Sequence, residues 1–357
     1  MSTLRTNALL DASGGTTATV NGIPLRPGVL DPENRIINGA FDFWQRGTSS
    51  TAAGYVAADR WVNQLSGGTV TQSRQAFALG DTLGANSPTY FLRQTVSGQT
   101  LASQRAHTEH RIEGVRSYAG QTITILGWAR RSSGSGNMAL EPLQNFGTGG
   151  SPSATVAIAP QTVTLTSSFA PFAVTIAVPS ISGKTLGTNN NDYFAFGFWT
   201  SAGSDFNART NSLGLQTIGV DLWGIHIKQG THTTSAVDLY RQPELGPELA
   251  RCQRYFQVFV SSGAVFAGRA SGTTGVIYGV PLAVPMRSNP SANNPNMSFY
   301  GPSSFGASSG GTNTLLSYSS SGISSQASFV RIGFTGVVDD RAANVYLTGD
   351  MSLDAEL

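Results

Sequence analysis

Short runs of alternating large apolar and small or polar residues dominate the chain from Asn34 to about Tyr240. The alternation is clearest over residues 122–125 and 194–198, where every second side chain is large and hydrophobic. A period of two is typical of β-strands that present one face to a hydrophobic core. The pattern predicts strands over residues 68–77, 89–96, 121–130, 161–166, 172–178, 193–199 and 216–227.

Segments rich in Gly, Ser, Thr and Asn separate these predicted strands, at residues 132–137, 147–153 and 187–192. Such residues favour turns, because they tolerate backbone conformations that other residues avoid. Many short strands punctuated in this way are typical of a β-sandwich or jelly roll. We therefore expect an all-β domain over residues 34–240.

One segment breaks the β pattern. Residues 247–256 show helical spacing, with a proline at the start and Glu248 in the first turn, where a carboxylate stabilises the helix dipole. The predicted apolar stripe consists of Leu245, Leu249, Cys252 and Phe256. We expect residues 241–256 to form a linker helix, with Cys252 as a small buried apolar residue.

Two further segments flank this unit. Residues 257–357 return to strand-like patterns and predict a second, smaller β-sandwich, with strands over 257–260, 264–267, 274–280, 297–300, 314–318, 328–335 and 344–353. Residues 1–33 are polar and rich in Gly, Thr and Pro, which predicts an extended N-terminal arm.

Composition narrows the function classes. Charged residues make up only 12% of the chain, against about 25% in typical soluble domains, and the net charge is +2. Neither the charge nor any basic run predicts nucleic-acid binding. The 18 Phe, 10 Tyr and 5 Trp supply core material. A single cysteine rules out an intrachain disulfide, and the lack of a long apolar run predicts no membrane insertion.

Candidate catalytic and metal-binding groups are sparse. His107, Glu109 and His110 lie close in sequence, but on a strand positions 107 and 110 point to opposite faces, which disfavours a shared metal. Asp42 and Asp59 could form the acid pair of a glycan hydrolase, although Arg60 beside Asp59 favours an ion pair. Trp128, Trp199 and Trp223 lie on predicted strands. A tryptophan on a strand of a sandwich is more often buried in the core than exposed as a surface that stacks on a sugar, so we expect these three to be core residues. We expect no enzymatic activity.

The densest aromatic and charged cluster opens the predicted sandwich, at residues 34–48 and 58–61. Together with residues 219–230 and the segment Glu248-Leu-Ala-Arg-Cys-Gln-Arg-Tyr255, it resembles bacteriophage virion proteins of the tail-fibre type that carry a jelly roll like that of carbohydrate-binding modules. We interpret the cluster as a structural motif whose aromatic residues pack in the core and whose arginines pair with nearby acids. Its members are Phe41, Phe43, Trp44, Arg46, Asp59, Arg60 and Trp61.

The resemblance implies a virion structural protein on the tail or capsid surface, made in the host cytoplasm. It implies a homotrimer that attaches to a host-surface glycan, with residues 1–33 anchoring it to other virion proteins. It supplies no catalytic residues. Two alternatives stay open: a capsid decoration protein or head fibre, and a glycan depolymerase. Segments similar to those around Asp42 and Asp221 hold a structural calcium in some carbohydrate-binding modules, so these two acids are candidate calcium ligands, although calcium needs more oxygen ligands than two.

Overall fold

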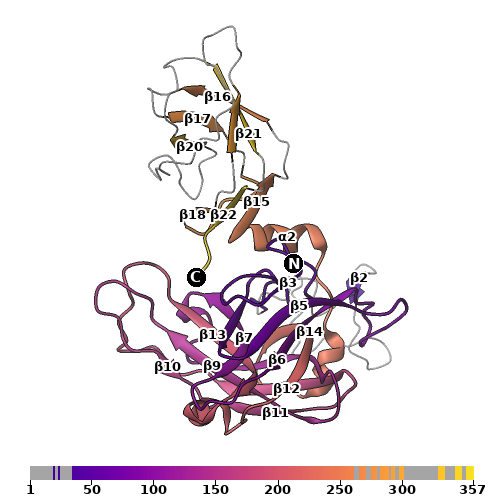
Figure 1. Cartoon of the computed structure of the whole chain (residues 1–357). Coiled ribbons are helices and arrows are strands. Elements are labelled where there is room, and N and C mark those ends of the chain that lie inside the picture. Colours follow the sequence, from indigo (N-terminus) through magenta and orange to yellow (C-terminus); the bar gives the residue numbers. More distant parts are fainter. Residues whose placement is uncertain are drawn as a thin grey trace, which may run out of the picture.

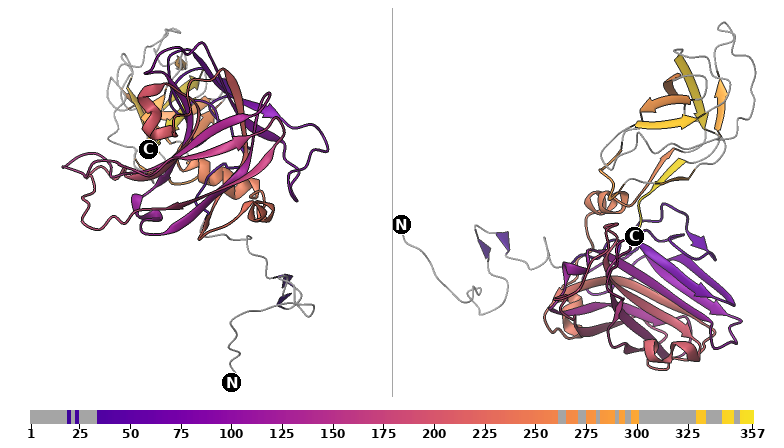
Figure 2. Two further views of the ribbon diagram at one scale, coloured as in Figure 1. Left: turned by 90° about the horizontal axis from the view of Figure 1, so that it is seen from below. Right: turned by 90° about the vertical axis from the view of Figure 1, so that its left-hand side faces the viewer.

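Two six-stranded antiparallel sheets face each other between residues 34 and 240 and form a β-sandwich (Figures 1 and 2). This is a computed structural model that describes residues 34–260, 282–288 and 351–357. It also describes strands at 19–20, 23–24, 265–270, 275–279, 291–293, 297–300, 329–333 and 342–347. The all-β fold class predicted from sequence is confirmed.

The first sheet, sheet I, has the strand order β12-β8-β14-β6-β5-β3. Its strands are β3 (Ser49–Ser50), β5 (Thr69–Ala76), β6 (Tyr90–Ser97), β8 (Thr122–Arg131), β12 (Ala170–Ala177) and β14 (Ile218–Gln229). The second sheet, sheet II, has the order β10-β9-β13-β7-β4, with β11 also paired to β9. Its strands are β4 (Trp61–Ser66), β7 (Arg105–Glu113), β9 (Gly136–Asn145), β10 (Val156–Ala157), β11 (Gln161–Leu165) and β13 (Tyr193–Ala202).

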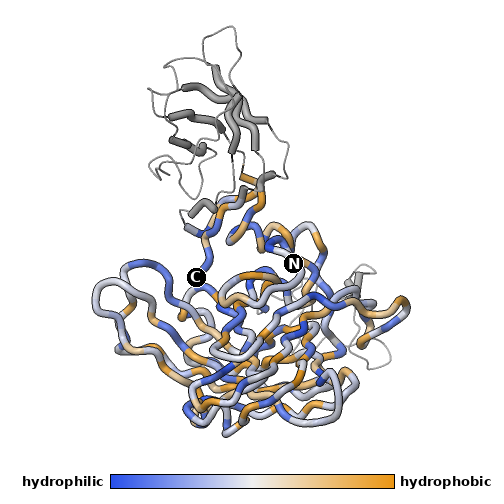
Figure 3. Tube along the Cα trace, viewed as in Figure 1, coloured by the Kyte–Doolittle hydropathy of each residue, from blue (hydrophilic) through white to orange (hydrophobic). Residues whose placement is uncertain are grey.

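The hydrophobic core fills the space between the sheets. In β13, Phe194, Phe196 and Phe198 belong to the core cluster, as do Leu92 of β6 and Leu222 of β14. Hydrophobic and hydrophilic residues alternate along the strands of the sandwich (Figure 3). This alternation places every second side chain on the outer face of each sheet.

Short helical segments lie in the connections: η1 (Val115–Ser117), η2 (Ser204–Phe206), α1 (Asn207–Thr210) and η3 (Thr234–Leu239). The helix α2 (Leu245–Gln253) follows the sandwich and leads into β15 (Phe256–Val260). Within the described residues, no helix has the length and hydropathy needed to cross a membrane.

The remaining strands form three small sheets. β15 pairs with β22 (Met351–Asp354), which also pairs with β18 (Ser291–Asn293). The five-stranded sheet contains β16 (Val265–Ala270), β17 (Gly275–Gly279), β19 (Met297–Tyr300), β20 (Phe329–Gly333) and β21 (Ala342–Leu347). β1 (Thr19–Val20) pairs with β2 (Ile23–Pro24). The second sandwich stays a prediction; most of the arm at 1–33 and the strand expected at 314–318 lie outside the described residues.

The strands expected between residues 68 and 227 are confirmed as β5, β6, β8, β11, β12, β13 and β14. The alternation predicts no strand at β4 or β9, and β7 is not among the strands that it predicts. β7 reads Arg-Ala-His-Thr-Glu-His-Arg-Ile-Glu, and its core-facing Thr108 and His110 break the apolar pattern. β9 contains Pro142, a residue that is uncommon inside strands.

The helix α2 lies within the linker predicted over residues 241–256; it begins two residues before the helical spacing that starts at residue 247 and ends at Gln253. The predicted apolar stripe is partly wrong, because Leu245 is 58% exposed whereas Glu248 is 3% exposed. Glu248 is buried because its carboxylate accepts hydrogen bonds from the backbone N–H of Asn38 and from Arg251. Cys252 is buried, as predicted.

Candidate functional site

The opening motif forms a tight turn against the sandwich. Asn38, Phe41 and Arg60 have φ angles of 58°, 58° and 71°, a region that non-glycine residues seldom adopt. The Asn38 side chain holds this backbone, because its Nδ2 donates to the carbonyl of Phe43 (2.8 Å) and its Oδ1 accepts from the Phe43 N–H (3.0 Å). The indole of Trp61 donates to the carbonyl of Asn38 (3.0 Å).

The aromatic residues of the motif lie inside the protein. Phe41 and Trp61 are 0% exposed and Trp44 is 8% exposed. Phe43 packs against Ile37 and its neighbours in a separate small cluster. Phe41, Trp44 and Trp61 therefore offer no free aromatic face to a ligand.

The two arginines of the motif pair with acids from the far end of the chain. Arg46 contacts Asp354 (3.0 Å) and Glu356 (3.2 Å), and Arg60 pairs with Glu356. The expected ion pair at Asp59 is wrong: its carboxylate accepts instead from the backbone (3.0 Å) and side chain (2.6 Å) of Gln45. Burial raises the pKa of Asp59.

The two candidate calcium ligands have separate partners. Asp42 accepts from Gln242 Nε2 at 2.8 and 3.0 Å. Asp221 is 0% exposed and accepts from Arg93 and Arg130 through both oxygens. Two guanidinium groups on one carboxylate would repel a cation, and the described residues contain no cluster of three potential metal ligands. The expectation of calcium at this pair is therefore wrong for Asp221.

His107 and His110 point to opposite faces of sheet II, as the strand period requires. His107 stacks on Trp199 with ring centroids 4.1 Å apart on the outer face. The His110 ring lies 5.9 Å from Phe196 on the core side, and its Nε2 lies 3.3 Å from the backbone nitrogen and 3.2 Å from the carbonyl oxygen of Ile37. Burial lowers the pKa of both imidazoles.

Two carboxylates flank Gly197 on the outer face of sheet II. Glu109 and Glu141 lie in register with Gly197 on the two neighbouring strands. Arg209 and the Trp199 indole (3.0 Å) both donate to Glu141. Burial acts to raise the pKa of Glu109, but His107 and Arg111 beside it lower the pKa to about 2. The sequence does not predict that Glu109 and Glu141 lie together, because they are 32 residues apart on β7 and β9, which the alternation does not identify as strands.

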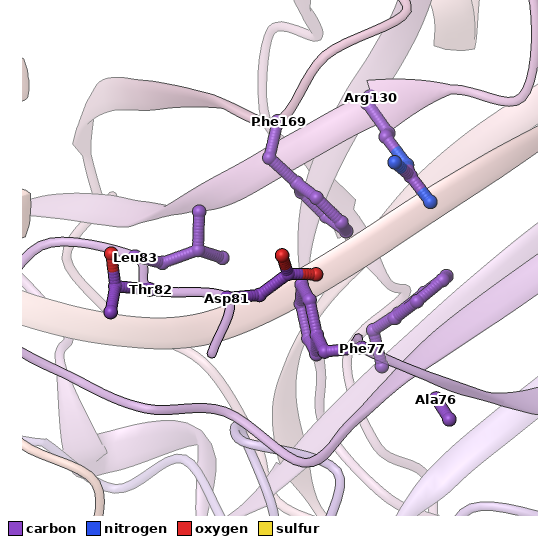
Figure 4. Close-up of a pocket in the computed structure, with 8 residues that line it drawn as sticks. Ala76, Phe77, Asp81, Thr82, Leu83, Arg130 and Phe169 are labelled. Carbon is purple, nitrogen blue, oxygen red and sulfur yellow. The ribbon is translucent and has the colours of Figure 1, made fainter. Parts of the chain in front are cut away.

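A pocket of about 260 Å³ opens on the outer face of sheet I (Figure 4). Phe91 and Arg130 rise from β6 and β8, and Phe169 comes from the turn before β12. The segment after β5 closes another side. The lining residues are Ala76, Phe77, Asp81, Thr82, Leu83, Phe91, Arg130 and Phe169.

Three phenylalanine rings form the apolar part of this pocket. The ring centroids of Phe77 and Phe91 are 4.9 Å apart, those of Phe77 and Phe169 are 5.2 Å apart, and those of Phe91 and Phe169 are 5.3 Å apart. The guanidinium of Arg130 lies 4.5 Å from the Phe169 centroid and 5.1 Å from the Phe91 centroid. Figure 4 shows the carboxylate of Asp81 near the Phe77 and Phe169 rings.

Aromatic walls combined with a few fixed polar groups suit a small, partly polar ring compound such as a sugar. The three phenylalanines come from positions 77, 91 and 169, and none of them drew attention in the sequence. Their separation along the chain hides the cluster. The sequence offers one signal, because Phe77 ends the strand predicted over residues 68–77.

No protein-family model matches the chain, and no curated protein matches it in sequence. Among solved structures, the enzymatically active domain of tailspike protein 4 from bacteriophage CBA120 is similar at 12% identity and a TM-score of 0.33, over 55% of this chain and 21% of that one. A family 4 carbohydrate-binding module is similar at 15% identity and a TM-score of 0.32, over 54% and 98%. The N-terminal cellulose-binding domain of Cellulomonas fimi β-1,4-glucanase C is similar at 13% identity and a TM-score of 0.30, over 52% and 97%. TM-scores this low do not allow the function of any of these proteins to be assigned to this chain.

Proposed function

We propose that this chain is a phage virion structural protein, a tail fibre or spike, whose sandwich binds a host-surface glycan in the pocket on sheet I. The sequence motifs at residues 34–61 and 247–256 support the virion part of the proposal. The pocket supports the glycan part. It combines two partly exposed aromatic rings, Phe77 and Phe169, with Arg130 and Asp81, and this combination is the observation that carries the proposal.

Each part of the pocket has a role in sugar binding. Phe77 and Phe169 contact each other and are only partly buried, and their exposed parts would pack against one apolar C–H face of a sugar ring with little loss of conformational entropy. Arg130 donates hydrogen bonds and Asp81 accepts them, so ring hydroxyls find partners of both kinds. A pocket of about 260 Å³ is below the range of roughly 300–1,000 Å³ for drug-sized ligands, which favours one sugar ring of a longer glycan.

We propose binding without hydrolysis. Cleavage of a glycosidic bond uses one protonated carboxylic acid and one carboxylate. Glu109 and Glu141 are two carboxylates on one sheet face, and Arg111 and Arg209 hold them in ion pairs. With its pKa near 2, Glu109 carries no proton to donate near neutral pH.

The remaining parts of the proposal concern assembly. We propose that residues 1–33 attach the protein to other virion proteins and that three copies associate, with the sandwich displayed on the particle surface. A capsid decoration protein or head fibre would use the same pocket and differ in what residues 1–33 contact.

The test is binding of the purified full chain to an oligosaccharide panel, with a reducing-sugar assay in parallel. We expect binding without release of reducing ends. T82W places an indole at the pocket mouth and should abolish binding, whereas T100W adds the same bulk at another exposed site and should not. If T82W bound glycans as the wild type does, the pocket would not be the binding site. Release of reducing ends would refute the non-enzymatic role.

A further inference from the structure

We infer that the pocket on sheet I selects a sugar that carries a carboxylate group. The inference rests on the proposed glycan function and adds the chemical class of the ligand. It depends on how Arg130 is held, on the charge around it, and on where Asp81 lies.

Arg130 belongs to a row of three charged residues across sheet I. Arg93 of β6 and Arg130 of β8 are each the register partner of Asp221 in β14, so the three side chains share the outer face. Asp221 Oδ2 accepts from Arg130 Nε at 2.7 Å. Arg93 donates to Oδ1 at 2.6 Å and to Oδ2 at 2.7 Å. One buried carboxylate thus fixes two guanidinium groups.

This arrangement leaves an edge of Arg130 available. Its Nε is bound to Asp221, and the terminal Nη1 and Nη2 make no hydrogen bond within the part of the chain that the structure describes. The guanidinium plane is fixed beside the rings of Phe91 and Phe169. An arginine held in this way presents two parallel N–H groups, the geometry that binds a carboxylate through two hydrogen bonds.

The row also has a surplus of positive charge. Two guanidinium groups share the single negative charge of Asp221, so the sum is one positive charge. The Arg130 side chain is 29% exposed. A bound carboxylate would neutralise the surplus in a partly desolvated setting, where the attraction exceeds that in bulk water.

Asp81 restricts the anion that fits. Its Oδ2 accepts from the backbone N–H of Ala78 at 2.9 Å, which leaves Oδ1 to accept from a ligand. No ion pair links Asp81 to Arg130 among the described residues. Asp81 repels a doubly charged phosphate more strongly than a singly charged carboxylate. A sugar acid offers both a carboxylate for Arg130 and hydroxyl groups for Asp81.

The inference is tested by comparing matched ligands on the full chain. The probes are uronic-acid and sialic-acid oligosaccharides, each paired with its methyl ester, together with neutral oligosaccharides. We expect carboxylated probes to bind and their esters to bind at least tenfold more weakly. R130Q should reduce affinity for the acid to that for the ester. R130K, which keeps the charge without the planar fork, should fall between the wild type and R130Q.

The control is R116Q, which removes the same charge at an exposed position in η1, outside the pocket. It should leave both affinities unchanged. D81N removes an acceptor for ring hydroxyls and also the repulsion of the ligand carboxylate, so it should weaken the ester and increase the preference for the acid. Equal binding of acid and ester would overturn this inference and leave the proposed function standing. The same would follow if only neutral glycans bound and T82W still abolished their binding. Failure to bind any glycan would overturn both.

Discussion

Arg60 and Glu356 form a buried ion pair although 296 residues separate them in the sequence. The Arg60 guanidinium also lies 3.5 Å from the ring centroid of Tyr255 and donates to the carbonyl of Arg111 (2.7 Å). Arg287 adds bonds to the carbonyls of Ala355 and Glu356. The segment 353–357 therefore closes onto the opening motif, directly beside α2 and β15 (Figure 1).

Replacing Glu356 by Gln should destabilise the protein strongly. The side chains of Arg60 and Glu356 are 1% and 6% exposed, and removing one partner of a buried pair typically costs about 3–5 kcal/mol. Urea unfolding followed by tryptophan fluorescence measures the change. D354N removes an acid whose side chain is 36% exposed and should cost less than about 1 kcal/mol. Equal losses in the two variants would contradict the role assigned to burial.

Replacing Gly127 by Ala should destabilise the sandwich. A Cβ atom at this position would lie 2.6 Å from Ile225 Cδ1 and 3.3 Å from Phe172 Cε1, inside the core. Overpacking of this kind costs about 1–3 kcal/mol, measured as a lower unfolding midpoint. The matched control is G246A in α2, where no atom lies within 4 Å of the new Cβ and alanine favours the helix. A neutral G127A would show that the core adjusts freely.

Stability should fall as the pH drops from 7.5 to 5. Burial, followed by the charge of Arg60, lowers the pKa of His110 well below its usual value. The folded protein keeps this imidazole neutral, whereas the unfolded chain takes up a proton below about pH 6.5. The stabilisation is therefore present above that pH and is lost below it. H110Q should reduce the dependence of the unfolding free energy on pH, because glutamine can hydrogen-bond with Ile37 but does not titrate. The contribution of His107, whose pKa is also lowered by burial, should remain. An unchanged slope in H110Q would refute this.

Replacing Phe169 by Ala should weaken glycan binding roughly tenfold, which is about 1.4 kcal/mol. Phe169 is only partly buried, so the fold should persist. Isothermal titration with the best probe of the oligosaccharide panel measures the affinity. L101A removes a leucine that is 59% exposed away from the pocket and should bind normally. A wild-type affinity in F169A would show that the Phe169 ring does not contribute to glycan binding.

Deleting residues 1–33 should abolish incorporation into the particle and leave the sandwich folded. The described core begins at Asn34, and its cluster draws on residues from Ile36 onward. Particles produced with the truncated chain can be assayed by immunoblot, alongside thermal unfolding of the purified protein. Normal incorporation of a folded truncated chain would show that another segment makes the attachment.

The sequence allowed the sandwich to be predicted where one strand face is strongly apolar. Residues 194–198 identify β13 because large and small side chains alternate there. The same reasoning does not find β7, because its core-facing positions include Thr108 and His110, the register partners of Phe198 and Phe196. Without large apolar residues at these inward positions, the strand shows no alternation against its polar outer face.

The sequence by itself determined the fold class and the burial of the aromatic opening motif, because both follow from local patterns of residue size and polarity. Only the tertiary structure decided what the charged groups do. Arg60 meets Glu356, Asp221 holds Arg93 and Arg130, and the rings of Phe77 and Phe169 meet around the pocket. These partners are far apart in the chain, and hydrogen bonds and ion pairs form between neighbours in space, whose identity depends on strand order and register.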